Sequence, residues 1–361
     1  MARFPLLSVI VPVYNSSGSL SRCLRALQSS NYRNFELLVV DDCSSEDVRK
    51  IIECSGARYF RPDSRLRPAG ARNLGAMHAQ GEILVFVDAD VMVSNETLQT
   101  IVEDFQKNPS ISALFGSYDD APAEGNFFSQ YKNLLHHYVH QTSNSRAVTF
   151  WTGCGAVRAE IFRELHGFDA RMSSIEDIEF GLRLTQSGHS ILLDKNLHVK
   201  HLKYWTLRGI IKSDVCDRAA PWAQLILEKG EMPRDLNLNY RARISGAAIL
   251  PLAGLGGVVP ISAYLGKNLL MWIILGCLSG VLLLLALNQD IYRFFWKKRG
   301  AGFALAIIPV HWLYYLYSGL VWIYCCGRHY LKMAVNLPSP RENYFPSRPF
   351  PVQRRPKRLV N

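Results

Sequence analysis

The first 205 residues alternate short apolar runs with amphipathic segments. Three runs rich in β-branched residues, at 6–13, 35–40 and 82–90, end in turn or acidic residues and predict buried parallel strands. Apolar residues spaced i, i+3, i+4 and i+7 predict amphipathic helices over 20–27 and 98–105. Strands and helices that alternate with short links predict an α/β sheet with right-handed crossovers.

After residue 244 the apolar residues form long runs instead. The runs 269–287 and 303–326 are each long enough to span a bilayer, which takes ~20 residues, whereas 244–265 is interrupted by Pro and Gly. We therefore predict a membrane region over 244–331 with two to three segments.

The stretch 206–243 connects these two regions. It mixes Trp and basic residues with Leu and Ile, and Pro221 predicts a break in any single long helix there. Its composition fits amphipathic helices in a membrane interface and an ordinary pair of surface helices equally well. Its position directly before the apolar runs favours the interface. The tail 332–361, rich in Pro and Arg, is predicted to be disordered.

Charge separates the same regions. The net charge is +11, but residues 290–361 hold 12 Lys and Arg against two acidic residues, so the rest of the chain is nearly neutral. Nucleic-acid binding needs basic residues interleaved with aromatics on a folded surface, whereas this excess lies beside apolar runs and suits an anionic membrane surface. Its two clusters, 293–299 and 348–358, are separated by one span, so the cytoplasmic preference of basic residues leaves the topology open.

The cysteines and the N-terminus indicate the compartment. Eight Cys occur without CxxC spacing, so neither a zinc site nor a disulfide framework is indicated. MARFPLLSVIVPVYN lacks the longer apolar run and the cleavage site of a secretory signal. We expect an integral protein of the cell membrane whose first 240 residues lie in the cytoplasm.

Acidic residues follow two of the predicted strands, at the edge where α/β sheets bind ligands. Asp88 and Asp90, one residue apart after the third strand, offer hard oxygen ligands for Mg²⁺ or Mn²⁺, the ions that bridge phosphates. Ordinary loop carboxylates are the alternative, and the strongly apolar strand before them favours the metal site. Asp42, after the second strand, can accept hydrogen bonds from a nucleotide base or ribose.

Two further stretches carry candidate chemistry. PAGARNLG (68–75) places Arg72 and Asn73 at a helix start, where a guanidinium and free amides favour a phosphate or a base, although an ordinary capped helix fits as well. EDIEFGLRL (176–184) places Glu176, Asp177 and Glu179 shortly after the small-residue run TGCGA (152–156). Acidic residues suit a helix N-terminus, but one of them can also serve as a general base.

Fingerprints of other nucleotide enzymes are missing. No GxGxxG follows the first predicted strand, and no GxxxxGK[ST] occurs in the sequence. These absences disfavour a hydride-transfer enzyme and a P-loop phosphotransferase.

Taken together, SVIVPVYN, VVDD, AGARNLG, VDADV, TGCGA and EDIEFGLR resemble, in this order and spacing, the family 2 inverting glycosyltransferases of the GT-A fold. The resemblance covers about residues 6–205. It implies a Rossmann-like nucleotide-diphospho-sugar transferase domain over 1–205, followed by interfacial helices over 206–243 and the α-helical membrane region. It also implies a nucleotide-sugar donor, with UDP as the default and GDP or dTDP open.

The resemblance assigns the nucleotide and metal contacts. The nucleotide is expected over Pro12 and Tyr14, with Asp42 on the base, helped by Arg72. Asp90 is expected as the more direct ligand of the divalent cation. The other donor-side residues are Asp88 on the cation, His201 as a third contact to the metal or the diphosphate, and Gly153 and Gly155, whose backbone passes beside the donor sugar.

The resemblance makes Asp177 the catalytic base, with Glu176 and Glu179 orienting the helix, the acceptor or the sugar. A hydroxyl acceptor must lose its proton as the bond forms, whereas a polyprenyl phosphate arrives ionised. The intact acidic pair therefore favours a hydroxyl on a lipid alcohol, a glycolipid or a lipid-linked glycan.

The chain departs from the QxxRW motif of membrane polysaccharide synthases, because DRAAPW (217–222) lacks the Gln. We expect Arg218 and Trp222 near the acceptor entrance, and transfer of a single sugar at the cytoplasmic face. A polyprenyl-phosphate glycosyltransferase or a polysaccharide synthase of the same family is the alternative. An inactive membrane scaffold and a small transporter are remoter ones. His198 and the cluster HHYVH (136–140) have no counterpart in the family and are expected to be packing or surface residues.

Overall fold

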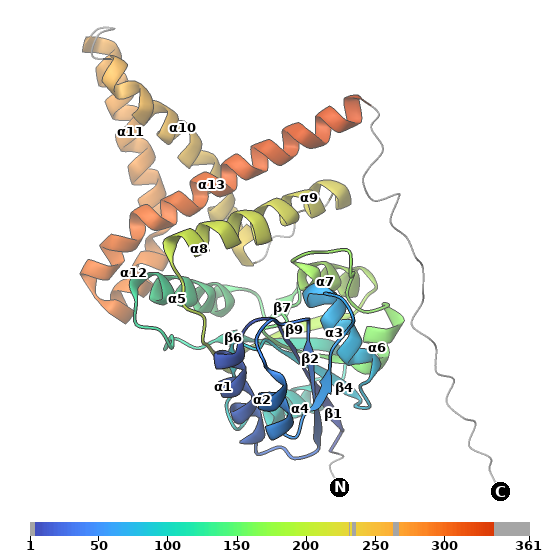
Figure 1. Ribbon diagram of the computed structural model, residues 1–361. Coiled ribbons are helices and arrows are strands. Elements are labelled where there is room, and N and C mark those ends of the chain that lie inside the picture. Colours follow the sequence, from blue (N-terminus) through green and yellow to red (C-terminus); the bar gives the residue numbers. More distant parts are fainter. Residues whose placement is uncertain (1–3, 231, 233–235, 263–266, 336–361) are drawn as a thin grey trace, which may run out of the picture.

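The computed structural model describes residues 4–230, 232, 236–262 and 267–335, as an α/β body followed by a group of helices (Figure 1). The predicted disordered tail lies outside the described residues from 336 onward, as does the end of the predicted segment 244–265.

The described residues form a nine-stranded sheet with the order β3-β2-β1-β4-β8-β6-β9-β5, and β7 pairs with β9. β1 is parallel to β2 and β4, whereas β8 is antiparallel to both of its neighbours. The strands are β1 (Leu7–Val13), β2 (Phe35–Asp41), β3 (Arg58–Phe60), β4 (Ile83–Val87), β5 (Val91–Met92), β6 (Ile111–Tyr118), β7 (Arg146–Ala147), β8 (Cys154–Arg158) and β9 (Ser190–His201).

Helices connect these strands. Within the α/β body they are α1 (Ser17–Gln28), α2 (Arg49–Cys54), α3 (Arg67–Met77), α4 (Thr97–Lys107), α5 (Phe127–Thr142), α6 (Ala159–Glu164) and α7 (Glu176–Gln186). After β9 the chain continues as α8 (Leu207–Lys212), the π-helical segment η1 (Ser213–Ala219), α9 (Ala220–Lys229), the 3₁₀ turn η2 (Leu236–Leu238), α10 (Tyr240–Ser262), α11 (Lys267–Leu287), α12 (Gln289–Arg299) and α13 (Ala301–Ala334).

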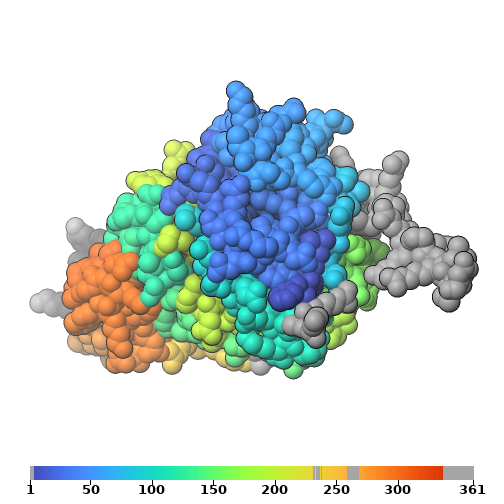
Figure 2. Space-filling model, turned by 90° about the horizontal axis from the view of Figure 1, so that it is seen from below, coloured from blue at the N-terminus to red at the C-terminus, as the bar shows by residue number. Residues whose placement is uncertain are grey.

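The core of the body has two apolar layers, one on each face of the sheet. Along β1, Val9 and Val11 point into the layer that contains α1 and α4, while Ile10 points into the layer with α3, α6 and α7. This alternation follows from the two-residue period of a strand. Figure 2 shows the molecule from below, where the N-terminal part of the chain, in blue and cyan, makes up most of the surface.

The predicted elements are confirmed in outline, with one difference in topology. The runs at 6–13, 35–40 and 82–90 form β1, β2 and β4, and the two predicted helices form α1 and α4. The three strands predicted as parallel are parallel, β1 to both β2 and β4. The far half of the sheet was not predicted, and there β8 runs antiparallel between β4 and β6. Cys154–Arg158 is short and contains a glycine, so its sequence gives little strand signal.

The predicted break at Pro221 is wrong. α8, η1 and α9 follow one another without a gap, and Pro221 falls in the first turn of α9. The π-helical segment directly before it changes the backbone bonding where proline lacks an N–H, so the helical path continues. We call the continuous path through α8, η1 and α9 the helical rod. α13 packs against its η1 and α9 parts, and Figure 1 shows the rod between the body and α13.

Two helices in the described part of the chain are long and apolar enough to cross a membrane, namely 268–287 in α11 and all of α13. Their apolar side chains are unusually exposed: Trp272 is 66% and Leu282 57% accessible in α11, and Leu305 is 67% accessible in α13. The core helix of a soluble protein would bury such residues, so their exposure suggests association with a membrane or another apolar partner. α10 and α11 pack against each other as a pair that projects from the body in Figure 1.

Candidate active site

Four of the acidic residues predicted as functional, Asp88, Asp90, Glu176 and Asp177, meet at the carboxyl end of β4. Arg72 of α3 is buried and donates from Nη2 to Asp88 Oδ1 at 2.6 Å, and from Nη1 to Glu176 Oε1. One guanidinium therefore joins the residue after β4 to the start of α7. Burial raises the pKa of Asp88 and of Glu176, and the charge of Arg72 opposes this rise in both. The prediction that Arg72 also contacts the nucleotide stays a prediction.

Strand pairing brings Asp90 to His201. Val91 of β5 pairs with His201 of β9, and the Asp90 carbonyl accepts from Leu202 N at 2.8 Å. As a result His201 Nε2 lies 3.4 Å from Asp90 Oδ2, while its Nδ1 lies 2.6 Å from Asn133 Oδ1. Burial acts to raise the pKa of Asp90, but the hydrogen bond and charge of His201 and the charge of Lys203 outweigh it, so this pKa is lowered.

These two side chains fit a divalent cation as a partial ligand set. An amide oxygen bonded to Nδ1 fixes the imidazole orientation, as outer partners of metal-binding histidines do, and turns Nε2 toward the carboxylate. In the described residues no group of three His, Cys, Asp or Glu side chains could hold a metal ion. Mg²⁺ and Mn²⁺ commonly take one or two protein carboxylates and complete their shell with phosphate and water, so two or three protein ligands suffice.

Asp177 stands at the first turn of α7 beside the TGCGA run. Its Oδ2 accepts from the backbone N and the hydroxyl of Thr152 at 3.2 and 3.3 Å, and its Oδ1 accepts from Ile178 N at 2.8 Å. Ile175, the residue before the helix, has a φ of 56°, a conformation that β-branched residues seldom adopt. The acidic first turn therefore satisfies helix amides and also holds one carboxylate in a fixed position, and the two interpretations made from the sequence are compatible.

The glycines of this run have a packing reason of their own. A Cβ on Gly153 would lie 2.1 Å from the indole of Trp151, and one on Gly155 would lie 2.3 Å from the Trp151 carbonyl oxygen. Trp151 in turn contacts Tyr118 edge to face at 4.8 Å. Both glycines are thus required by the protein itself, while the predicted approach of a donor sugar remains untested. Trp151 was not singled out from the sequence, because a single Trp before a small-residue run has no pattern to mark it.

The predicted nucleotide residues share one area at the ends of β1 and β2. Asp42 is buried and accepts from Leu66 N at 2.6 Å. Arg65, which sequence reasoning missed, lies 3.7 Å from Asp42 and stacks on the ring of Tyr14 at 3.6 Å. Tyr14 is 40% exposed, and Pro12, at the end of β1, pairs in the sheet with Val40. Asp41, by contrast, already has protein partners: its Oδ2 pairs with Arg61 Nη1 at 2.5 Å, and its Oδ1 accepts from Ser44 N at 2.8 Å.

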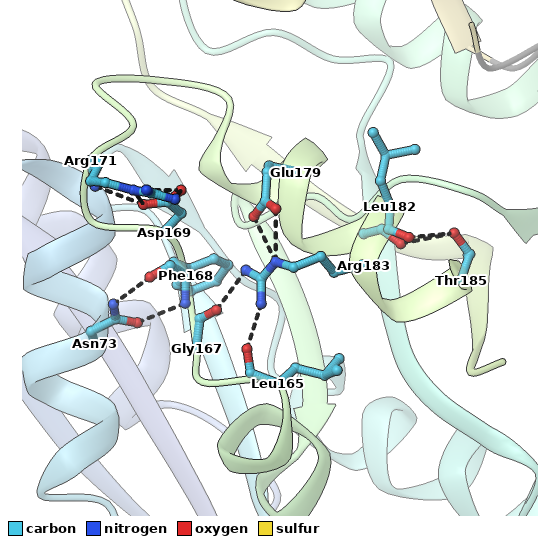
Figure 3. A network of polar contacts seen from close by, with 11 residues as sticks. Asn73, Leu165, Gly167, Phe168, Asp169, Arg171, Glu179, Leu182, Arg183 and Thr185 are labelled. Atoms are coloured by element: carbon cyan, nitrogen blue, oxygen red, sulfur yellow. Dashed lines mark hydrogen bonds and ion pairs between the residues drawn. The ribbon is translucent and has the colours of Figure 1, made fainter. Parts of the chain in front are cut away.

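The loop before α7 is fixed by a separate polar network, shown in Figure 3. Arg183 donates to both oxygens of Glu179 at 2.8 and 2.9 Å, and to the carbonyls of Leu165 and Gly167 at 2.5 and 2.7 Å. Asn73, from the AGARN stretch, exchanges two hydrogen bonds with the backbone of Phe168, at 2.7 and 2.9 Å. Glu179 therefore orients the loop and the helix, one of the roles expected for it.

A second polar cluster lies where the body meets the C-terminal helices, and we call it the helix junction: Lys132, His136, Asp214, Arg218 and Tyr317. Lys132 of α5 and Asp214 of η1 form an ion pair of 2.5 Å in which both side chains are almost fully buried. The Tyr317 hydroxyl of α13 donates to the other Asp214 oxygen at 2.7 Å. Burial lowers the pKa of Lys132 to about 8. The junction therefore fastens α5, η1 and α13 together.

The residues of DRAAPW lie beside both clusters. Arg218 donates from Nη1 to His136 Nε2 at 2.7 Å. Trp222 packs against an apolar group that includes Ile175 and Ile178, which flank the acidic pair of α7. In the histidine cluster His137 and His140 are buried, as expected for packing residues, whereas His136 holds Arg218.

Comparison with known proteins shows similarity to glycosyltransferases. Residues 8–166 match the family described as Glycosyl transferase family 2. An uncharacterized glycosyltransferase of Haemophilus influenzae is 26% identical over 223 residues, which cover 58% of this chain and 72% of that protein. The UDP-Glc:alpha-D-GlcNAc-diphosphoundecaprenol beta-1,3-glucosyltransferase WfgD of Escherichia coli is 33% identical over 117 residues, 32% of this chain and 46% of that one.

Among solved structures, the mannosyltransferase PcManGT from Pyrobaculum calidifontis in complex with GDP-Man and Mn²⁺ is similar, with a TM-score of 0.62 and 19% identity. The superposition covers 89% of this chain and 87% of that one, and at this identity it shows the fold alone. The chain thus carries a glycosyltransferase family 2 domain with the GT-A fold, followed by C-terminal helices, as the sequence predicted.

Proposed function

We propose that this glycosyltransferase moves a single sugar, with inversion, from a nucleotide-sugar donor to a hydroxyl of a lipid-linked acceptor at the cytoplasmic face of a membrane. The observation that carries the proposal is the position of Asp177. Its carboxylate is held by Thr152 beside the ion-paired group of Asp88, Arg72 and Glu176. A fixed carboxylate next to a cation-binding edge is what a single displacement at a sugar carbon requires.

In this proposal each residue has one task. Asp177 takes the proton of the acceptor hydroxyl as it attacks from the face opposite the departing diphosphate. Asp90 and His201, with Asp88, hold Mg²⁺ or Mn²⁺, which when bound stabilises the negative charge of the nucleoside diphosphate. The nucleotide base lies near Tyr14 and Asp42, and Arg65 offers a further contact there.

The lipid side of the proposal is supported by the exposed apolar surfaces of α11 and α13. WfgD, by its name, acts on a sugar linked to diphosphoundecaprenol. We place the chain in the same substrate class, with α10 to α13 in or against the membrane. A polyprenyl-phosphate acceptor and a growing polysaccharide remain as alternatives within the family, and the acceptor hydroxyl is preferred because the acidic pair is intact.

The test is donor-dependent release of nucleoside diphosphate by the full chain purified in detergent with added membrane lipids. UDP-, GDP- and dTDP-sugars are screened with Mg²⁺ and with Mn²⁺. Asp177→Asn is expected to lower the turnover number about 10²- to 10⁴-fold and to leave donor binding intact, since only proton transfer is lost. Asp90→Ala is expected to lose metal-dependent donor binding itself.

Glu103→Gln, on the outer surface of α4, is the matched control and should behave as wild type. Donor binding is measured independently, as a metal-dependent rise in the unfolding temperature. The proposal fails if no nucleotide sugar binds or reacts. It also fails if Asp177→Asn retains the wild-type rate.

A further inference from the structure

The guanidinium of Arg218 has no carboxylate partner. It is half-buried on η1, and in the described part of the chain no Asp or Glu oxygen lies within 4.0 Å of it. Among the described residues, the guanidinium forms a hydrogen bond to His136 Nε2, at 2.7 Å. Burial, and then the charge of Arg218, lower the pKa of His136 well below its usual value, so this ring is neutral and accepts the bond. His136 therefore orients the guanidinium without neutralising its charge.

The acid nearest along the chain, Asp217, is exposed and forms no ion pair within 4.0 Å of the Arg218 guanidinium. The next acid is already used. Asp214 lies one turn before Arg218 on the same segment, but its two oxygens are taken by Lys132 and by the Tyr317 hydroxyl. Counting these three charged groups, the helix junction has two cations for one anion. An uncompensated charge that is partly withdrawn from water is costly unless a partner arrives.

Arg218 also lies along a row of stacked rings that leads to the predicted metal ligands. His136 stacks with Tyr118 at 5.8 Å, and Tyr118 stacks with His201 at 4.3 Å, which faces Asp90. On its other side η1 packs against α13, one of the two apolar helices. One turn further on, Trp222 Nε1 is buried without a hydrogen-bond partner among the described residues. The guanidinium of Arg218 and the indole N–H of Trp222 thus lie between the acidic residues of the candidate active site and the apolar helices.

The backbone at this place is unusual as well. Ser213–Ala219 is π-helical, and single π-helical turns occur frequently at functional sites, where they redirect a side chain. Guanidinium groups bind phosphate oxygens with two parallel hydrogen bonds, and more strongly than neutral donors do.

We propose that Arg218, held by His136, binds a phosphate group of the acceptor, so that the enzyme selects lipid-diphosphate-linked sugars over neutral glycolipids and lipid alcohols. This inference rests on the proposed function and narrows its acceptor class. The same phosphate chemistry is present in the donor, whose diphosphate lies toward Asp90. The position of Arg218 against the apolar helices favours the acceptor.

The experiment uses the full chain in detergent with two soluble probes, farnesyl diphosphate and farnesol. Their affinities are measured by calorimetry in the wild type, in Arg218→Gln and in Arg218→Lys. Arg208→Gln, an exposed arginine on α8, serves as the control. We expect Arg218→Gln to weaken farnesyl diphosphate binding about 10- to 100-fold, with Arg218→Lys in between, because a charge-assisted pair is lost. Farnesol should bind all four proteins alike.

Binding of UDP and GDP with Mn²⁺ is measured on the same samples, which separates this inference from the proposed function. If neither nucleotide binds the wild type, the proposed function has failed. If a nucleotide binds but Arg218→Gln keeps the wild-type affinity for farnesyl diphosphate, the inference alone is wrong. A loss of nucleotide affinity in Arg218→Gln, with farnesyl diphosphate unaffected, would assign Arg218 to the donor and overturn it as well.

Discussion

Two polar clusters of opposite charge are linked by the ring of Tyr118, which stacks with His136 of the helix junction and with His201 beside Asp90. The acidic one holds four carboxylates, those of Asp88, Asp90, Glu176 and Asp177, and its buried arginine, Arg72, pairs with Asp88 and Glu176. In the helix junction there are two cations and one carboxylate, which pairs with Lys132, and no acid of the described residues pairs with Arg218. The first cluster lacks positive charge and the second lacks negative charge.

This difference is the physical basis of the two proposals. An excess of carboxylates at a strand end is compensated by a divalent cation, and an excess of guanidinium and ammonium groups by phosphate oxygens. A reaction that joins a metal-bound diphosphate donor to an anionic lipid-linked acceptor supplies both compensating groups. Variants that change one cluster and leave the other intact test whether the two clusters have separate functions.

The largest expected effect is that of Arg72→Met. The variant leaves the buried Glu176 and the partly buried Asp88 without their cation. Breaking a buried ion pair in this way typically costs ~3–5 kcal/mol of unfolding free energy. Activity should also be lost, because α7 carries Asp177. The measurement is denaturant unfolding of the full chain in detergent. Arg49→Met, which breaks an exposed pair with Glu53, is the control and should leave the midpoint unchanged.

The same variant should be sensitive to pH. Burial raises the pKa of Glu176, and Arg72 opposes that rise, so its removal raises this pKa further. A protein with such a carboxyl group becomes less stable as pH rises through the raised pKa, because the folded state then has to hold the charged form. The deficit of Arg72→Met should therefore be larger at pH 8 than at pH 5.5. A deficit that is equal at both values would mean that Arg72 does not hold these carboxylates ionised.

A smaller loss, about 3 kcal/mol, is expected for Lys132→Met or Asp214→Leu in the helix junction, since each leaves one buried charge alone. The double variant should lose clearly less than the two single losses added together, because it removes both charges. Nucleotide binding in the presence of Mn²⁺ should be unchanged in all three proteins. Strict additivity would contradict a direct ion pair, and weakened nucleotide binding would contradict the separation of the two clusters.

The sequence predicted the acidic cluster much better than the helix junction. Asp88, Asp90 and Asp177 follow a buried strand or begin a helix after a small-residue run, so local patterns identify them. His201 could be named only through the family resemblance, and its contact with Asp90 depends on the pairing of β5 with β9. No local pattern predicts that a lysine in the α5 sequence meets an aspartate 82 residues later.

The fold shows the same limit. Strongly periodic segments such as β1, β2, β4, α1 and α4 were predicted correctly, because their apolar side chains lie on one helix face or form a buried strand. The continuous path through Pro221 depends on a π-helical segment that has no sequence signal, and the antiparallel β8 depends on neighbours distant in sequence. The Arg65–Tyr14 stack was missed for this reason too, since its partners belong to different loops.

The smallest expected effect tests how separate the clusters are, and it concerns Trp222. Its side chain packs beside Ile175 and Ile178, near the acidic pair, yet it belongs to the same helical rod as Arg218. We expect Trp222→Ala to raise the acceptor KM about tenfold, equivalent to ~1.4 kcal/mol, with donor binding intact. Trp222→Phe should recover most of this loss, because it restores the apolar contact. The measurement is a pair of titrations on each variant, one of acceptor and one of donor. Equal weakening of both would show that the rod positions the whole of α7, and that the acidic cluster and the helix junction act as one unit.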